Sequence, residues 1–177
     1  MATTKWVLDP THSEVIFKIK HLMITNVTGS LTDFSVAAET ETDDFAHAKV
    51  SFKGQLASLT TQNEQRDIHL KSEDFFDIAT YPEILFDSTQ TGPKSEDGDF
   101  VLIGNLTIKN TTQVVQLNVE FGGIAKDPWG NIKAGFTVSG KINREDFGLT
   151  WNAALETGGV LVSNEVKINC ELQLVKQ

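Results

Sequence analysis

The feature that most constrains the fold of this chain is an alternation of apolar and polar residues that recurs along most of its length. In residues 13–21, for example, Val15, Phe17 and Ile19 alternate mainly with polar or charged neighbours. Side chains of a β-strand point alternately to its two faces, so a period of two predicts a strand with one buried face. Segments of this kind cover residues 13–21, 26–37, 48–56, 83–91, 100–108, 115–121, 132–142 and 165–175. The pattern therefore predicts an all-β protein with eight strands.

Turn signals between the segments predict that most strands are joined as hairpins. Asp97-Gly98 is a typical hairpin turn, Asn110 tolerates the positive φ of a tight turn, and residues 127–130 read Asp-Pro-Trp-Gly. Residues 144–163 lack the alternation and predict a long loop or a short helical excursion before the eighth strand. Consecutive hairpins favour a closed antiparallel up-and-down barrel, because an open sheet would leave two unpaired edges. A two-sheet sandwich would show the same alternation and is the main alternative.

The apolar positions of the predicted strands would meet inside such a barrel. An eight-stranded barrel is wide enough either to be filled by side chains or to hold one small ligand, and periodicity does not decide between the two. The expected interior set is Val15, Phe17, Ile19, Phe52, Phe86, Phe136 and Leu172.

Residues 60–77 interrupt the alternation between the third and fourth strands. Thr61 followed three residues later by Glu64 has the pattern of a capping box, which predicts a short helix that begins near Gln62. Ser72 offers a second helix start a little further on. The predicted helix is polar where a core-packing helix would be apolar, so we interpret it as a lid set against the barrel.

Length and charge limit the domain organisation and the partners. The chain has 177 residues and no Pro/Gly/Ser-rich linker, which suits a single domain over residues 1–177. Its net charge of −9 disfavours nucleic-acid binding and electrostatic docking to membranes. No window approaches the roughly 18 apolar residues of a transmembrane helix, so stable membrane insertion is not expected. The single cysteine, Cys170, excludes an internal disulfide.

Five short motifs follow one another along the chain. They are Trp6-x-x-Asp9-x-x-His12-Ser13-x-x-x-Phe17, Arg66-Asp67-x-His69-Leu70-x-Ser72-x-x-Phe75, Tyr81-Pro82-x-Ile84-x-Phe86-x-Ser88, Gly104-x-Leu106-Thr107-Ile108 and Asn143-Arg144-x-x-Phe147-Gly148. Each is weak alone, but their order and spacing together resemble the YceI family of lipocalin-like proteins over almost the whole chain. The departures are small, since Asn110 stands in place of a usual glycine and Leu31 in place of a usual phenylalanine.

The resemblance implies an extended lipocalin-like barrel around an apolar tunnel that holds a long-chain lipid. Ligand types in the family are polyisoprenoids, quinone-like molecules and fatty-acid derivatives, and the implied activity is binding or carriage without catalysis or a further cofactor. Many members carry a secretion signal, whereas the first ten residues here have no apolar signal core. We expect a cytoplasmic protein as the chain is written, and a periplasmic one if a leader was removed. A homodimer is compatible with these features.

Arg66, His69 and Lys71 are plausible donors to a lipid headgroup, because charged and polar N–H groups recognise phosphate or carbonyl oxygens at the end of an apolar pocket. The structural alternative is that Arg66 pairs with Asp67 and anchors the helix, since buried charges need partners. The full set of expected ligand-binding residues is Val15, Phe17, Ile19, Phe52, Arg66, His69, Phe75, Phe86, Leu102, Phe136, Phe147 and Trp151.

Two other classes of function stay open at the level of sequence. An enzyme on the same barrel could use His12-Ser13, or His69 with Asp67, but the chain has no G-x-S-x-G elbow. The histidines also lack the H-x-H or H-E-x-x-H spacing of metal ligands, so neither catalytic nor metal-binding residues are expected. A non-binding stress or assembly module would have no pocket and would instead expose an apolar patch.

Overall fold

The computed structural model describes residues 3–42, 44–153, 155 and 161–177. The strands are β1 (Thr4–Leu8), β2 (Glu14–His21), β3 (Thr25–Leu31), β4 (Phe34–Thr40), β5 (Lys49–Gln55), β6 (Leu59–Thr60), β7 (Glu83–Thr91), β8 (Phe100–Ile108), β9 (Thr111–Lys126), β10 (Ile132–Asn143) and β11 (Val162–Lys176). The helical elements are α1 (Glu64–Lys71) and the 3-10 turns η1 (Pro10–His12), η2 (Phe45–His47), η3 (Leu56–Ser58) and η4 (Arg144–Phe147).

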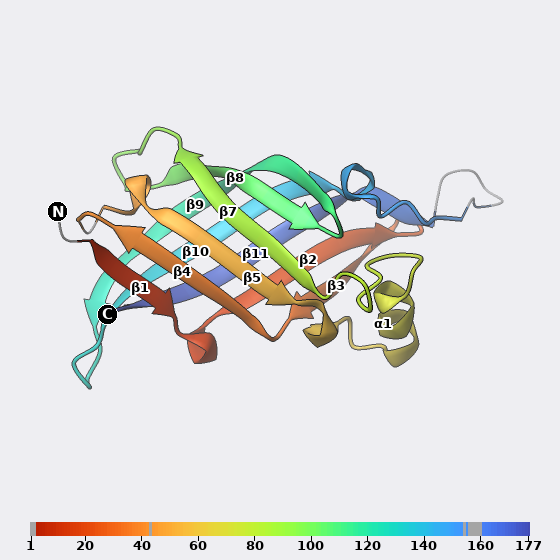
Figure 1. The fold of residues 1–177 in the computed structure, drawn as a ribbon, viewed down its shortest axis with the longest axis horizontal. Helices are drawn as coiled ribbons and strands as arrows, with labels where there is room; N and C mark the ends of the chain where they lie inside the picture. Colours follow the sequence, from red (N-terminus) through yellow and green to blue (C-terminus); the bar gives the residue numbers. More distant parts are fainter. Residues whose placement is uncertain (1–2, 43, 154, 156–160) are drawn as a thin grey trace.

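Hydrogen bonding closes the strands into one antiparallel barrel (Figure 1). The ring runs β1-β4-β5-β7-β8-β9-β10-β11, and β11 pairs back to β1. The two ends of β11 have different partners, because Leu174 pairs with Leu8 of β1 whereas Cys170 pairs with Val15 of β2. β1 and β2 are thus two halves of one interrupted barrel strand, and the same holds for β3 with β4 and for β5 with β6. The prediction of an eight-stranded barrel is confirmed.

The interruption between β1 and β2 begins at Asp9-Pro10, where proline has no N–H to donate to a ladder. Ser13 restores the pairing, because its hydroxyl accepts from the Gln173 N–H at 3.0 Å and donates to the Asp9 carbonyl at 2.8 Å. β1 was not predicted from the sequence, although this strand buries Trp6 completely. Five residues ahead of a proline are too few for an alternation to stand out.

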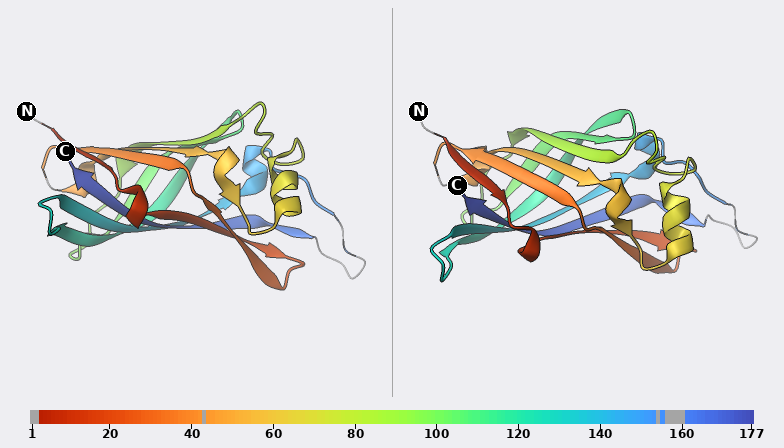
Figure 2. Two further views of the ribbon diagram at one scale, coloured as in Figure 1. Left: turned by 90° about the horizontal axis from the view of Figure 1, so that it is seen from below. Right: turned by 60° about the horizontal axis from the view of Figure 1, so that its bottom comes forward.

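The two ends of the barrel differ in what covers them (Figures 1 and 2). Both termini and the β9–β10 hairpin lie at one end, which we call the terminal end. The β2–β3 hairpin, η4 and α1 lie at the other, which we call the α1 end. Within the described chain no ladder joins β6 to β7, and residues 61–82 lie across the barrel there. No helix among the described residues is long and apolar enough to cross a membrane.

The helix of the lid begins two residues later than predicted and has a different cap. Asn63 is the N-cap, and its Oδ1 accepts from the Arg66 N–H at 3.0 Å. Thr61, the predicted cap, instead binds the Asp67 carboxylate through both its N–H and its hydroxyl. Ser72 does not start a second helix but ends the first, where its hydroxyl donates to a carbonyl of the last turn. The capping-box prediction was wrong because a neighbouring carboxylate outcompetes the helix for the threonine.

The terminal end of the barrel is filled with aromatic side chains. Phe45 enters from η2, and its ring lies 4.8 Å from the ring centroids of Trp6 and Phe136 and 5.9 Å from that of Phe121. The Trp6 Nε1 donates to the Thr40 hydroxyl at 3.2 Å, so the buried indole is satisfied. This half of the interior is a packed core.

Candidate functional site

A cavity of about 370 Å³ occupies the barrel toward the α1 end. Its walls are inward-facing apolar side chains from β2 to β5 and from β7 to β11, and its volume lies in the range of roughly 300–1,000 Å³ typical of ligand sites. The polar residues that line it belong to β2, the lid and η4, and they are Lys20, His21, Thr61, Arg66, His69 and Arg144. The cavity is therefore an apolar bore with one polar end.

Ten of the twelve expected ligand-binding residues line this cavity. They are Val15, Phe17, Ile19, Phe52, Arg66, His69, Phe75, Phe86, Leu102 and Trp151. Phe136 and Phe147 do not line it, so their predicted place beside a ligand in this cavity is wrong. Phe136 faces inward as predicted, but at the terminal end, where Phe45 packs against its ring. Phe147 is buried within η4, 2% exposed. Contact of the ten with a ligand stays a prediction.

The bore is open because its phenylalanines lie against glycines of the wall. A Cβ on Gly29 would lie 2.2 Å from Cζ of Phe17, its partner across the β2–β3 ladder. A Cβ on Gly104 would likewise lie 2.6 Å from Cζ of Phe86. Each ring thus occupies the space over a glycine instead of extending toward the barrel axis. A side chain in place of either glycine would push aromatic volume into the cavity.

Arg66 and Asp67 are held together through Thr61. The Arg66 Nε donates to the Thr61 hydroxyl and Nη2 donates to the Thr61 carbonyl, both at 2.7 Å. Asp67 accepts from the Thr61 N–H at 2.8 Å. This network ties α1 to the end of β6, which is the structural role weighed for the pair, although the contact is indirect. Within the described chain, Nη1 of Arg66 has no hydrogen-bond partner.

His69 belongs to a group of rings at the polar end of the cavity. Its Nε2 lies 2.8 Å from Oδ2 of Asp74, and because a carboxylate accepts, this nitrogen carries a proton. Edge-to-face contacts place the ring centroid 4.7 Å from Trp151 and 5.1 Å from Phe75. The aspartate and the two rings fix the imidazole in one orientation against the bore.

Arg144 is the most deeply buried charge among the residues that the structure describes, 2% exposed. Its Nε donates to the Ser163 carbonyl at 2.8 Å, and Nη1 donates to the carbonyls of Leu149 at 2.6 Å and Trp151 at 2.9 Å. Nη2 lies 3.4 Å from the Val162 carbonyl. Burial lowers the pKa of the guanidinium from its usual value, but an arginine keeps its charge in proteins. Arg144 therefore joins the loop after η4 to the start of β11 and places a positive charge beside the cavity.

The apolar side chains that the lid turns toward the cavity were not predicted as a group from the sequence. Leu70 and Phe76 line the cavity next to Phe75, so the lid closes the bore with apolar side chains as well as with the polar groups at its end. The signal was present as an apolar cluster, Phe75-Phe76 with Leu70, inside an otherwise polar segment. Its significance was hidden because a helix of eight residues is too short to show an apolar stripe.

The residues considered for catalysis are not brought together. The His12 Nδ1 binds Asp9 at 2.8 Å beside η1, whereas His69 binds Asp74 at α1. The Ser13 hydroxyl is engaged by backbone groups of the β1–β2 interruption. Among the described residues, no group of three or more His, Cys, Asp or Glu side chains is placed to hold a metal ion. Burial raises the pKa of the Cys170 thiol, which lines the cavity, to about 12.

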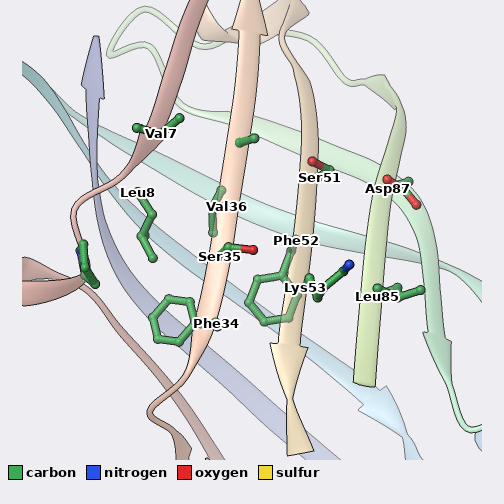
Figure 3. Close-up of a pocket in the computed structure, with 12 residues that line it drawn as sticks. Val7, Leu8, Phe34, Ser35, Val36, Ser51, Phe52, Lys53, Leu85 and Asp87 are labelled. Atoms are coloured by element: carbon green, nitrogen blue, oxygen red, sulfur yellow. The ribbon is translucent and has the colours of Figure 1, made fainter. Parts of the chain in front are cut away.

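A second hollow, of about 600 Å³, lies on the outer face of β1, β4, β5 and β7 (Figure 3). Small outward side chains of Ser35 and Ser51 form its floor, and Val7, Leu85 and Asp87 flank it. This hollow opens along the outer surface of the sheet. Wide exposure to water makes it a weaker ligand site than the enclosed bore.

Comparison with known proteins agrees with this architecture. The model of the YceI-like domain matches residues 6–174. UPF0312 protein SA2479 of Staphylococcus aureus is 39% identical over 171 residues, which cover 96% of each chain. The crystal structure of a Campylobacter jejuni YCEI protein superposes with a TM-score of 0.75 at 33% identity and 96% coverage of both chains. A polyisoprenoid binding domain from Saccharophagus degradans shares the fold, with a TM-score of 0.65 at 16% identity and coverage of 97% and 98%. The chain belongs to the YceI family.

Proposed function

We propose that this protein binds or carries one long-chain amphiphilic lipid, with the tail in the internal cavity and the headgroup at its polar end. The chemical class is a polyisoprenoid, a quinone-like molecule or a fatty-acid derivative. The observation that carries the proposal is the distribution of polarity along the bore, which is apolar except where the lid and η4 close it. The Saccharophagus degradans domain of the same fold, described as polyisoprenoid binding, supports it.

The energetics of an apolar bore fit a carrier. Each buried CH₂ gains about 0.8 kcal/mol relative to water, and over a long tail this sum would exceed the practical affinity ceiling of roughly 18–21 kcal/mol. The tail comes from a membrane of similar apolarity, however, so its transfer into the bore is close to balanced. Release then needs no large energy input, and discrimination among lipids falls to the headgroup.

Arg66 is the side chain best placed to read the headgroup. Thr61 fixes two of its guanidinium nitrogens, Nε and Nη2, and leaves Nη1 for a ligand. Because the side chain is already ordered, binding a headgroup costs little further conformational entropy. A guanidinium N–H binds a phosphate or carbonyl oxygen with a charge-assisted hydrogen bond. His69 lines the same end, held by Asp74.

Extraction of purified protein with organic solvent, followed by mass spectrometry, tests the proposal. We expect about one lipid per chain, and native mass spectrometry should show the matching mass. Arg66→Ala should keep a tail in the bore but broaden the range of headgroups. Lys71→Ala is the matched control. Lys71 lies on the same helix and was also a candidate donor from the sequence, but it binds the Ala57 carbonyl at 3.0 Å and does not line the cavity. Protein that repeatedly contains no lipid, although it was expressed in cells that make such lipids, would overturn the proposal.

A further inference from the structure

The β2–β3 hairpin presents three apolar side chains at the α1 end. Leu22, Met23 and Ile24 are 38%, 49% and 75% exposed. Leu22 and Met23 both have positive φ, of 55° and 64°, and the Ile24 N–H bonds the His21 carbonyl at 3.2 Å. A turn with two positive φ values prefers Asn-Gly, and leucine or methionine there is sterically unfavourable. Neither burial nor turn chemistry accounts for these residues, which points to a use outside the folded core.

The hairpin adjoins the polar end of the cavity. His21, at the last pair of the hairpin, lines the bore. The Leu22 N–H binds the carbonyl of Leu161 at 2.8 Å, and Leu161 lines the bore as well. The β2–β3 hairpin therefore lies at the same end of the barrel as α1 and the polar end of the cavity (Figure 2).

A row of lysines crosses the outer face of the barrel near this hairpin. Lys141 pairs with Lys167 across β10–β11, and Lys167 pairs with Lys18 across β11–β2. All three are exposed, and like charges side by side on a sheet repel each other. Glu165 of β11 neutralises part of the row, because its Oε1 lies 3.9 Å from Nζ of Lys141. Four residues further along β11 toward the terminal end the same face becomes acidic, where Glu171 pairs with Glu14.

This polarised face changes what the net charge implies. A charge of −9 predicted that electrostatic docking to membranes is unfavourable, but that prediction assumed an even distribution. The wall beside the hairpin is locally basic, and basic clusters beside apolar anchors are the combination that binds anionic bilayers. The lid carries exposed Glu64, Glu73 and Asp74, so the favourable approach is through the hairpin side of the α1 end.

The spacing allows both contacts at once. Lys18 precedes Leu22 by four residues, which at about 3.3 Å per residue places the basic row roughly 13 Å from the tip. Interfacial anchors insert by about 5–10 Å into the headgroup region. With the tip inserted, the lysines remain within about one Debye length, roughly 8–10 Å, of the anionic surface.

We propose that the α1 end docks on an anionic bilayer, with Leu22, Met23 and Ile24 in the interface and the row Lys18, Lys141 and Lys167 over the headgroups. Docking in this orientation sets the polar end of the bore against the membrane, so that a tail can pass between bilayer and cavity with little exposure to water. The exchange step rests on the proposed lipid binding, whereas docking itself does not.

Sedimentation with phosphatidylcholine vesicles, with and without phosphatidylglycerol, tests the docking. The wild type should bind the anionic vesicles, and binding should weaken as salt rises. Ile24→Asp should weaken it by roughly tenfold or more, because an isoleucine leaves the interface and a negative charge enters. Lys18→Gln and Lys167→Gln should each weaken it by about fivefold on anionic vesicles only.

A matched variant shows whether the location matters. Trp129→Asp changes an apolar side chain, 83% exposed, in the β9–β10 hairpin at the terminal end. It should bind vesicles like the wild type. Loss of binding in Trp129→Asp with retention in Ile24→Asp would overturn the proposal, as would wild-type protein that never sediments with anionic vesicles.

Lipid content, measured by extraction from each variant, separates this proposal from the proposed function. Ile24→Asp should unfold at the wild-type temperature and retain the lipid acquired during expression, while its exchange with vesicles slows. Protein that holds lipid but never docks would sink the docking alone. Protein that docks but is always empty would sink the lipid cargo alone.

Discussion

The two ends of the barrel are built from the same alternating strands, yet one is solid and the other hollow. At the terminal end the rings of Trp6, Phe45, Phe121 and Phe136 pack on one another with centroids 4.8–5.9 Å apart. At the α1 end the rings of Phe17 and Phe86 lie over glycines of the wall. Aromatic residues are present at both ends, so aromatic content does not explain the difference.

The difference comes from the connections between the strands and from the glycines over which the phenylalanine rings lie. η2 turns Phe45 into the barrel, where it fills the centre. At the other end residues 61–82 close the bore from outside and contribute only Leu70, Phe75 and Phe76 to its lining beside the polar groups. Whether a small barrel is filled or hollow therefore depends on the connections as much as on the strands, because a connection that inserts no side chain into the centre leaves a cavity.

The largest expected effect is at the packed end. Phe136→Asp would place an unpaired carboxylate against the rings of Phe45 and Phe121, and we expect a loss of more than about 4 kcal/mol, enough to abolish folding. Circular dichroism and thermal unfolding measure this directly. The same change at Phe17 should be milder, because its ring borders a cavity that water can enter. A Phe136→Asp variant with wild-type stability would show that the terminal end is not a packed core.

Truncation of two equally buried phenylalanines compares the ends quantitatively. Phe45 and Phe86 are each 5% exposed. Phe45→Ala should cost about 3–5 kcal/mol, because it leaves a void among close-packed rings. Phe86→Ala should cost only about 1.5–3 kcal/mol, since it enlarges a space that already exists. Urea denaturation of both variants gives the two values, and equal losses would contradict the distinction between a solid and a hollow end.

The alternation allowed most of the fold to be predicted, because one buried face leaves its period in every long strand. It identified Val15, Phe17 and Phe86 as inward-facing, and the structure places them on the bore. It placed Phe136 inward as well, but it gave no information on whether this residue lies at the terminal end or at the α1 end. The sequence does not distinguish them, because a side chain that packs in a core and one that borders a cavity are both apolar.

The remaining errors come from competition between local signals. Thr61 and Asn63 both have side chains that cap helices, and only the position of Asp67 in space decides between them. β1 is short and ends at Asp9-Pro10, so its alternation was too brief to be identified. The indirect link from Arg66 through a threonine could not be inferred from spacing, since spacing suggested a direct ion pair.

A smaller effect tests why the bore is open. Gly29→Ala would force the Phe17 ring off its seat and into the cavity, because all three nearest atoms to the new Cβ belong to that ring. We expect a loss of about 1–3 kcal/mol and a lower lipid content after purification. Gly135→Ala is the control at the terminal half of β10, where a Cβ would meet nothing within 4 Å, and its stability should stay within about 0.5 kcal/mol of the wild type. Unchanged lipid content in Gly29→Ala would mean that the ring over the glycine does not hold the bore open.

The smallest expected effect is electrostatic and belongs to the outer surface of the terminal half. A hydrogen bond from the Lys133 Nζ at 2.6 Å is the main reason that the pKa of Asp9 lies well below its usual value; burial opposes the shift, and Thr11 and His12 add to it. A lowered pKa in the folded state gives stability that is fully present above the unfolded pKa of about 3.9 and is lost as the pH falls below it. Asp9→Asn should therefore cost about 1 kcal/mol near neutral pH, and its deficit relative to the wild type should shrink as the pH falls from about 4 toward the folded pKa. The midpoints of urea denaturation of the two proteins across that pH range measure the deficit. Every other carboxylate is common to both proteins, so it does not contribute to the difference. A deficit independent of pH would show that the charge of Asp9 does not stabilise the contact between β1 and β10.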